Sequence, residues 1–383
     1  MDKRTNLAST MKYYIIAGEA SGDLHASKLI QALRQKDADA NVRAWGGDLM
    51  EKEGAVIVNH YRDLAFMGFI EVIANLPTIL GNMRYCKRDL TQFNPDIVIF
   101  VDYPGFNIPI AKFAKQKGYK TAYYISPQVW AWKENRVKTL RTVIDKMMVI
   151  LPFEKEFYKK WDFEVAYVGH PLIEIIDAFK STSQAAETKA SLGISNDKKI
   201  IALLPGSRKQ EIEKKLPIML KASLDFPEQE FVVAQAPGIH DELIGQYTKA
   251  YNNVHVLKGD TYGLLSIADA ALVTSGTATL ETALFGVPQV VCYKGSPISY
   301  AIAKRVIKVA YISLVNLIMN RLVVKELIQD ELNPTNIKKE LSKILMDEST
   351  KKQIASDYQA LHSLLSAGGK ASEKAATIIY SMS

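Results

Sequence analysis

The feature that most constrains the fold of this chain is a short apolar run that recurs along most of its 383 residues. Each run is about five residues long and is followed by a glycine, serine or proline turn and then by an amphipathic stretch. Continuous apolar runs of this length are typical of parallel strands buried on both faces. Their alternation with helical patterns predicts an α/β fold with doubly wound sheets. The runs are residues 13–17, 97–101, 122–125, 147–151, 200–204, 231–234, 270–273 and 287–291.

A change in composition divides the chain into two such halves. Residues 179–190 are polar and poor in apolar side chains, and the alternation restarts after them. Residues 333–383 read as helices only, which could pack across the two halves or onto a partner chain. At roughly 150 residues per domain, the length also fits two domains. We therefore predict domains at 1–177 and 178–345, followed by a helical tail at 346–383.

The amino-acid composition limits the classes of possible binding partner but does not identify one. With 48 basic and 41 acidic residues the net charge is +7, which favours nucleic acid, an anionic membrane or a phosphorylated substrate. The basic residues are spread along the chain, so we do not expect nucleic-acid binding. The 2 cysteines are too few for a disulfide framework. The N-terminus lacks an apolar core, and no apolar stretch is long enough to span a membrane, so we expect neither a secretory signal nor a spanning helix.

Ligands in doubly wound sheets bind beyond the carboxyl ends of the strands. In the first half, one strand runs into the turn at 18–23, which favours close approach of a substrate or is simply a tight turn. Another strand runs into Asp102, within the sequence DYPGFN. Asp102 fits a general base with a pKa raised by burial, and it equally fits a cap on the next helix.

The second half carries two turns suited to an anion. At 205–209, Gly206 and Ser207 open a helix beside Arg208, whose guanidinium can bind phosphate with two parallel hydrogen bonds. At 274–281 a second turn of small residues opens another helix, and Glu281 could accept from ribose hydroxyls. Each turn also fits an ordinary capped helix that binds no ligand. In that case Arg208 is solvated and Glu281 lies on the helix surface. Together the turns favour a diphosphate or a nucleotide.

Signals for metal or hydrolase chemistry are missing from the sequence. The 6 histidines are scattered, and the pattern Asp37-Ala38-Asp39 falls in a loop at the opposite edge of its predicted sheet. No GxSxG motif occurs. We therefore predict no metal site and no cofactor.

Two apolar segments are unusual. Residues 64–80 read as a helix with one narrow polar stripe, which fits deep core, a membrane-surface insert or an acyl-chain site, and periodicity alone favours core. Residues 298–319 mix basic and apolar side chains, which fits an anionic lipid surface as well as a packed helix with a solvated basic face.

A series of short motifs runs along the chain. They are GEASGD (18–23), AFMGFIEV (65–72), VDYPGFN (101–107), YISPQVWAWKENRV (124–137), LPFEKEFY (151–158), VGHPL (168–172), LLPGSR (203–208), SGTATLE (275–281), YISLVNL (311–317) and VKEL (324–327). In these motifs the chain resembles the lipid-A-disaccharide synthase family. The resemblance runs in order from about residue 13 to 361, and the first ten residues lie outside it. The combination of GEASGD, MGFIEV and SPQVWAW is specific, whereas PGSR also occurs in other nucleotide-sugar enzymes.

This resemblance implies two Rossmann-like domains facing a cleft, the GT-B type, and an inverting glycosyltransferase. The implied reaction joins UDP-2,3-diacylglucosamine to 2,3-diacylglucosamine 1-phosphate by a β(1→6) linkage and releases UDP. It also implies a homodimer with exchanged C-terminal segments, peripheral on the cytoplasmic face of the inner membrane. The alternatives are another UDP-sugar enzyme, such as a 2-epimerase or a peptidoglycan-type transferase, and a non-catalytic nucleotide-binding scaffold on the membrane.

Residue by residue, the resemblance assigns Asp102 as the general base on the acceptor 6-hydroxyl. It also raises membrane or acyl contact above core for the segment 64–80. The sequence departs from the family at Val315, where proline is common, and at 319–321, where a glycine turn is common. The UDP-sugar residues implied are Gly206, Ser207, Arg208, Ser275, Gly276, Thr277, Glu281 and Asn316; those on the acceptor side are Gly18, Ser21 and Asn107; and those of the membrane or acyl contact are Phe66, Met67, Phe69, Ile70 and Ile73.

Overall fold

The computed structural model describes residues 10–64, 76–182, 185–296, 300 and 309–383. The chain forms two compact units. Unit 1 runs to Pro171 and also contains Leu365–Ser383, and unit 2 is Leu172–Leu364. The last helix of the chain therefore belongs with the first unit. Phe66, Met67, Phe69, Ile70 and Ile73, predicted to contact membrane or acyl chains, lie outside the described residues.

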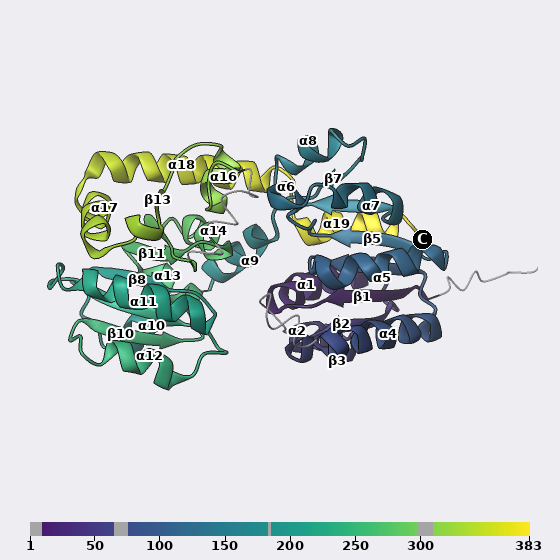
Figure 1. The fold of residues 1–383 in the computed structure, drawn as a ribbon, viewed down its shortest axis with the longest axis horizontal. Coiled ribbons are helices and arrows are strands. Elements are labelled where there is room, and N and C mark those ends of the chain that lie inside the picture. Colours follow the sequence, from purple (N-terminus) through teal and green to yellow (C-terminus); the bar gives the residue numbers. More distant parts are fainter. Residues whose placement is uncertain (1–9, 65–75, 183–184, 297–299, 301–308) are drawn as a thin grey trace, which may run out of the picture. The chain divides into compact units, whose positions relative to one another are not determined.

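Unit 1 is built on a parallel sheet of seven strands in the order β3-β2-β1-β4-β5-β6-β7 (Figure 1). Its strands are β1 (Lys12–Ala17), β2 (Asn41–Gly46), β3 (Val56–His60), β4 (Ile97–Val101), β5 (Lys120–Tyr124), β6 (Lys146–Val149) and β7 (Ala166–Tyr167). Its helices are α1 (Ala20–Lys36), α2 (Asp48–Lys52), η1 (Tyr61–Leu64), α4 (Leu76–Phe93), α5 (Pro104–Gln116), α6 (Val129–Trp132), α7 (Arg136–Val143), α8 (Glu154–Lys159) and α19 (Ala371–Tyr380).

Unit 2 is built on a parallel sheet of six strands in the order β10-β9-β8-β11-β12-β13. Its strands are β8 (Ile200–Leu204), β9 (Glu230–Gln235), β10 (Val254–Lys258), β11 (Ala270–Thr274), β12 (Gln289–Tyr293) and β13 (Lys325–Ile328). Its helices are α9 (Pro171–Lys180), α10 (Ala185–Ser191), α11 (Lys209–Ser223), α12 (Asp241–Thr248), α13 (Thr261–Ile267), α14 (Thr277–Leu284), α16 (Leu314–Met319), η2 (Gln329–Glu331), α17 (Pro334–Met346) and α18 (Glu348–Ser366).

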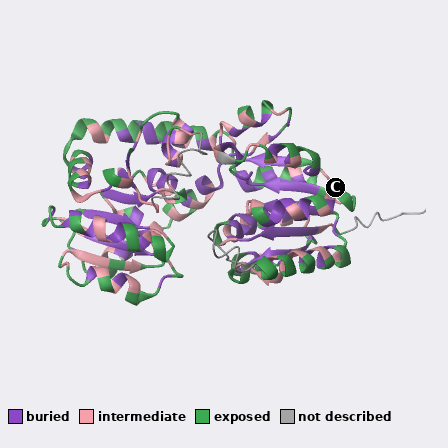
Figure 2. Cartoon of the chain, viewed as in Figure 1, coloured by how far each residue is buried: buried purple, intermediate pink, exposed green. Residues whose placement is uncertain are grey.

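The predicted α/β fold with two doubly wound parallel sheets is confirmed. Strands β4, β8 and β11 are buried along their whole length, as continuous apolar runs require (Figure 2). In unit 1 successive side chains of β1 alternate between two cores. Tyr13 packs in the core that includes α1 and α19, and Tyr14 packs in the core that includes α4 and α5.

The strand order of each sheet reverses at one place, and that place is where ligands of such sheets bind. In unit 1 the reversal lies between β1 and β4, with Ala17 opposite Val101. In unit 2 it lies between β8 and β11, with Leu204 opposite Val273. The turns singled out in the sequence follow these four strands. Within the described ranges, no helix is both long and apolar enough to cross a membrane.

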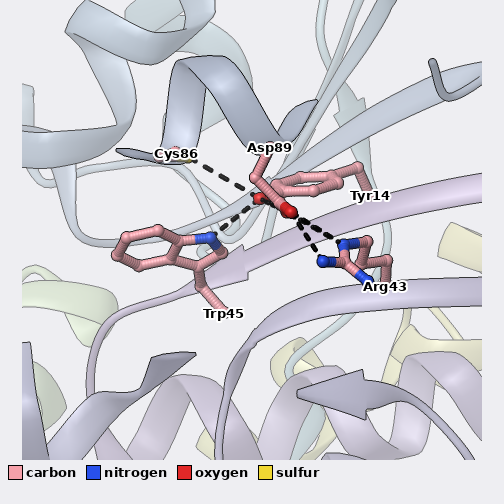
Figure 3. A network of polar contacts seen from close by, with 5 residues as sticks. All are labelled: Tyr14, Arg43, Trp45, Cys86 and Asp89. Atoms are coloured by element: carbon pink, nitrogen blue, oxygen red, sulfur yellow. Dashed lines mark hydrogen bonds and ion pairs between the residues drawn. The ribbon is translucent and has the colours of Figure 1, made fainter. Parts of the chain in front are cut away.

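A buried polar network fastens α4 to the first two strands of unit 1 (Figure 3). Arg43 of β2 donates from Nε and Nη2 to the carboxylate of Asp89 on α4, and Nη2 lies 2.6 Å from Oδ1. The hydroxyl of Tyr14 donates to Asp89 Oδ2 at 2.7 Å and accepts from Trp45 Nε1 at 2.8 Å. Burial raises the pKa of Tyr14, so it stays protonated and remains a donor. The Sγ of Cys86 lies 4.0 Å from the same hydroxyl.

The first prediction concerns this network. Asp89→Ala leaves Arg43 without its carboxylate and Tyr14 without its acceptor, so we expect a loss of about 2–4 kcal/mol in the free energy of unfolding. Asp48→Ala is the matched control, because the Arg62–Asp48 pair has a similar 2.8 Å separation but both side chains are more than 60% exposed. The control should lose less than about 1 kcal/mol. Equal losses in urea denaturation would refute an anchoring role for the Arg43–Asp89 pair, in which Asp89 is buried and Arg43 is half-buried.

Candidate active site

The turn after β4 holds its backbone in a strained conformation. Asp102 has φ 42° and Tyr103 has φ 48°, so two consecutive residues with side chains occupy the left-handed region. Each such residue costs free energy and persists only where its surroundings enforce it. Strain of this kind clusters at functional sites, and here it falls on the residue predicted to be the base.

Three neighbours enforce the turn. Asn107 is fully buried, and its Nδ2 donates to the carbonyl of Asp102 at 2.7 Å and reaches the carbonyl of Val101 at 3.3 Å. The hydroxyl of Tyr123 donates to the same Asp102 carbonyl. At Gly18, a Cβ atom would lie 2.3 Å from the ring of Tyr103, so this position must be glycine for that ring to pack. Asn107 and Gly18 thus act on the shape of the turn.

The carboxyl group of Asp102 is tuned toward neutral pH. Burial is the main cause and the negative charge of Glu19 adds to it, and together they raise the pKa of Asp102 from 3.8 to about 7. Glu19 precedes α1 at the end of the neighbouring turn. A carboxylate with such a pKa can take up a proton from a substrate and release it again. Motif reasoning did not single out Glu19, although it lies inside GEASGD.

Ser21 and Asp23, which also belong to the segment 18–23, have different surroundings. Ser21 is exposed on the first turn of α1. Asp23 is buried, and its carboxylate accepts from the backbone N–H groups of Gly47, Leu49 and Met50. Asp23 therefore caps α2 and fixes the loop beside the site.

In unit 2 the turn after β8 presents an exposed cation. Gly206 has φ 120°, and a Cβ there would lie 2.3 Å from Glu211 Oε2. Ser207 and Arg208 are exposed, and α11 begins directly after them. Arg208 Nη1 lies 3.7 Å from Glu211 Oε1, a pairing that exposure to solvent weakens. The turn therefore combines a helix start with an accessible guanidinium, which suits an anion.

The neighbouring turn, after β11, adds a second helix start. Ser275 donates from Oγ to the carbonyl of Ile312 at 2.8 Å. Gly276 has φ 148° and is exposed, and the exposed Thr277 is the first residue of α14. Because β8 and β11 are paired, the two turns open at one edge of the sheet.

Glu281 lies one turn further along α14, at the wall of a cavity of about 420 Å³. Its carboxylate accepts from the hydroxyl of Tyr262 at 2.9 Å. Burial raises the pKa of Glu281 above its usual value. The cavity combines aromatic rings with acidic groups, and its lining residues are Phe179, Gly259, Asp260, Thr261, Tyr262 and Glu281.

Asn316 is fully buried and serves the backbone around it. Its Nδ2 donates to Glu326 Oε1 at 2.9 Å and to the carbonyl of Val324 at 2.8 Å. Its Oδ1 accepts from the N–H groups of Val323 and Val324. Glu326 in turn accepts from the N–H of Ile312, whose carbonyl receives the hydrogen bond of Ser275, so Asn316 supports that segment through Glu326. No group of metal-binding side chains gathers anywhere in the part of the chain that the structure describes.

Solved structures define the class to which this fold belongs. The chain is similar to the UDP-GlcNAc 2-epimerase of Neisseria meningitidis, with a TM-score of 0.66 and 14% identity over 97% of this chain and 99% of that chain. It is similar to a calicheamicin glycosyltransferase, with a TM-score of 0.60 and 15% identity over 98% of each chain. At such identities the likeness shows the fold alone: two Rossmann-like units of the GT-B type.

Sequence relatives define the family. The family model described as lipid-A-disaccharide synthetase matches residues 13–379. The chain is 40% identical to the lipid-A-disaccharide synthase of Syntrophus aciditrophicus over 95% of this chain and 96% of the relative. It is 36% identical to that of Geobacter metallireducens over 98% of each. The chain belongs to the lipid-A-disaccharide synthetase family. The predicted family and enzyme class, a glycosyltransferase, are confirmed, and the epimerase and scaffold alternatives are not favoured.

The second prediction uses the raised pKa of Asp102. An acid with a higher pKa in the folded chain than in the unfolded chain favours folding at low pH, and this contribution is lost as the pH rises from about 4 to 7. At pH 8 we therefore expect Asp102→Asn to be more stable than the wild type by about 1–3 kcal/mol, and at pH 4 nearly equal. Asp39→Asn, at an exposed site, is the control and should show no such pH dependence. Urea denaturation at both pH values measures the difference, and a destabilised Asp102→Asn at pH 8 would contradict it.

Proposed function

We propose that this chain joins UDP-2,3-diacylglucosamine to 2,3-diacylglucosamine 1-phosphate by a β(1→6) linkage, with inversion at the sugar carbon and release of UDP. The observation that carries the detailed proposal is the strained turn at the carboxyl end of β4, which holds a carboxyl group of pKa about 7 at the point where the sheet order reverses. Family membership supports the choice of substrates.

The acceptor reacts on the side of unit 1. The 6-hydroxyl of the acceptor attacks the sugar carbon of the donor, and Asp102 takes the hydroxyl proton as the new C–O bond forms. The bond from that carbon to the β-phosphate oxygen breaks in the same displacement, so a single base suffices and no covalent intermediate is needed. Gly18 and Asn107 act by holding the turn, and Ser21 faces the acceptor from the first turn of α1.

The donor binds on the side of unit 2. Its diphosphate lies against the turn of Gly206, Ser207 and Arg208 and against the turn of Ser275, Gly276 and Thr277. As UDP leaves, negative charge grows on the β-phosphate, where Arg208 and the N–H groups at the starts of α11 and α14 stabilise it. The uridine lies in the cavity beside Glu281, whose carboxylate accepts from the ribose hydroxyls. Asn316 holds the backbone segment behind the second turn.

We also propose that the chain binds peripherally to the cytoplasmic face of the inner membrane. Along one stripe of α4 lie the exposed Leu76 and Leu80 and then the exposed Arg84 and Arg88, spaced four residues apart. An apolar and basic stripe of this kind suits an anionic lipid surface. The segment predicted to contact membrane or acyl chains leads directly into this helix. Co-sedimentation with anionic vesicles tests the placement, and binding that is unchanged in an Arg84→Glu, Arg88→Glu variant would contradict this stripe.

A homodimer with exchanged C-terminal segments is proposed from the family resemblance. In the chain described here α19 packs against α1 through Ala375, Ala376 and Ile379. An exchanged tail would make the same contact with α1 of a partner. Equilibrium sedimentation tests this proposal, and a monomer at micromolar concentration would contradict it.

The third prediction tests the reaction itself. With the two synthetic lipid substrates, we expect mass spectrometry to show one disaccharide product and stoichiometric UDP. Asp102→Asn should lower kcat by about 10²–10⁴-fold, the usual contribution of a general base, while UDP affinity is retained.

Asp96→Asn is the control for this prediction. Asp96 is exposed and lies immediately before β4, at the opposite end of the strand from Asp102, so it should leave the rate unchanged. Turnover of Asp102→Asn within about threefold of the wild type would contradict the base assignment, and the absence of a disaccharide would contradict the proposed function.

A further inference from the structure

Lys215 is a lysine buried in the interior of unit 2. It lies on α11, its side chain is only 3% exposed, and its Nζ donates to Thr274 Oγ1. Lysine is almost never buried to this degree without a partner of opposite charge. Burial is the main cause that lowers the pKa of Lys215.

The position of the ammonium group is tied to both anion-binding turns. Thr274 is the last residue of β11 and directly precedes Ser275. Helix α11, which carries Lys215, begins directly after Arg208. Nζ therefore reaches from α11 to the carboxyl end of β11, next to the residue at which the second turn begins.

Charges of both signs act on Lys215, because Glu211 opposes its charge whereas Arg208 and Lys214 carry the same sign. Glu211 is the acidic group that acts on it most strongly, and the same carboxylate lies 3.7 Å from Arg208. No carboxylate lies within ion-pair distance of Lys215 in the ranges that the structure describes. Glu211 thus acts on both Lys215 and Arg208. The nearby Cys292 adds no charge, because burial raises the pKa of its thiol to about 12.

We infer that Lys215 is the second cation of the diphosphate site and that it acts on the ligand through its buried charge. This inference rests on the proposed function and adds the means by which the site distinguishes a nucleoside diphosphate from an uncharged nucleoside. Arg208 is 59% exposed, so salt screens its attraction, whereas a buried charge is screened much less. A bound diphosphate supplies the negative charge that Lys215 lacks in the chain alone.

The test compares two neighbouring lysines on one helix. Lys215→Met removes the buried charge and keeps most of the side-chain volume, and Lys214→Met removes an exposed charge one residue away. Titration calorimetry of the full chain with UDP and with uridine gives the affinities. We expect Lys215→Met to weaken UDP binding about tenfold, to leave uridine binding unchanged and to keep the melting temperature. Lys214→Met should match the wild type for both ligands.

Unchanged UDP affinity in Lys215→Met would overturn the inference, as would an equal loss for UDP and uridine. If Lys215→Met fails to fold, Lys215→Gln keeps a donor to Thr274 Oγ1 and removes only the charge, with the same expected result. Failure of both variants to fold would assign Lys215 to the structure alone and overturn the inference. Disaccharide formation by the wild type is scored separately, so loss of this inference leaves the proposed function standing, and absence of the disaccharide defeats that function whatever Lys215 does.

Discussion

The site in unit 1 depends on the hydrogen bonds that converge on one backbone carbonyl, that of Asp102. Asn107 and Tyr123 both donate to it, and together they hold two consecutive residues in the left-handed region. Without these bonds the turn would relax, since each left-handed residue costs free energy. The strained turn keeps the carboxylate beside Glu19 in surroundings that disfavour its charge. The backbone conformation of the turn therefore contributes to the pKa of Asp102, which is near 7.

The two units place groups of opposite charge at equivalent positions of their sheets. Each sheet reverses its strand order once, and each reversal carries two turns. In unit 1 the turns bring two carboxylates together, Asp102 and Glu19, which raises the affinity for a proton. In unit 2 the two turns begin helices α11 and α14, and one of them carries Arg208. Together with Lys215, which is buried on α11, these groups favour an anion. An inverting transfer to a hydroxyl needs both properties: a base for the acceptor and a positive environment for the leaving diphosphate.

The sequence predicted most of the inner strands and the turns that follow them, because a strand buried on both faces is apolar throughout. Neither β2 nor any of the four edge strands was among the predicted apolar runs, because β7 has only two residues and β2, β3, β10 and β13 mix polar with apolar side chains. Asp102 and Arg208 could be proposed as site residues from the sequence, since ligands bind at the carboxyl ends of strands. The influence of Glu19 on Asp102 and the burial of Lys215 depend on contacts between distant segments, which no local pattern encodes. For the same reason the sequence did not place α19 with the first unit, where it packs on α1. The predicted boundary at 177/178 also differs from the division after Pro171.

The central claim is that Asp102 is the base, with a pKa that burial raises and that the charge of Glu19 raises further. The pH dependence of kcat/KM for the acceptor, measured at saturating donor, tests this claim most directly. A base must be deprotonated, so kcat/KM of the wild type should fall about tenfold per pH unit below an inflection near pH 7. Glu19→Gln removes the negative charge that helps to raise this pKa, and it should move the inflection to lower pH. A profile that is flat from about pH 5 to 8, or an inflection that does not move in Glu19→Gln, would contradict the account.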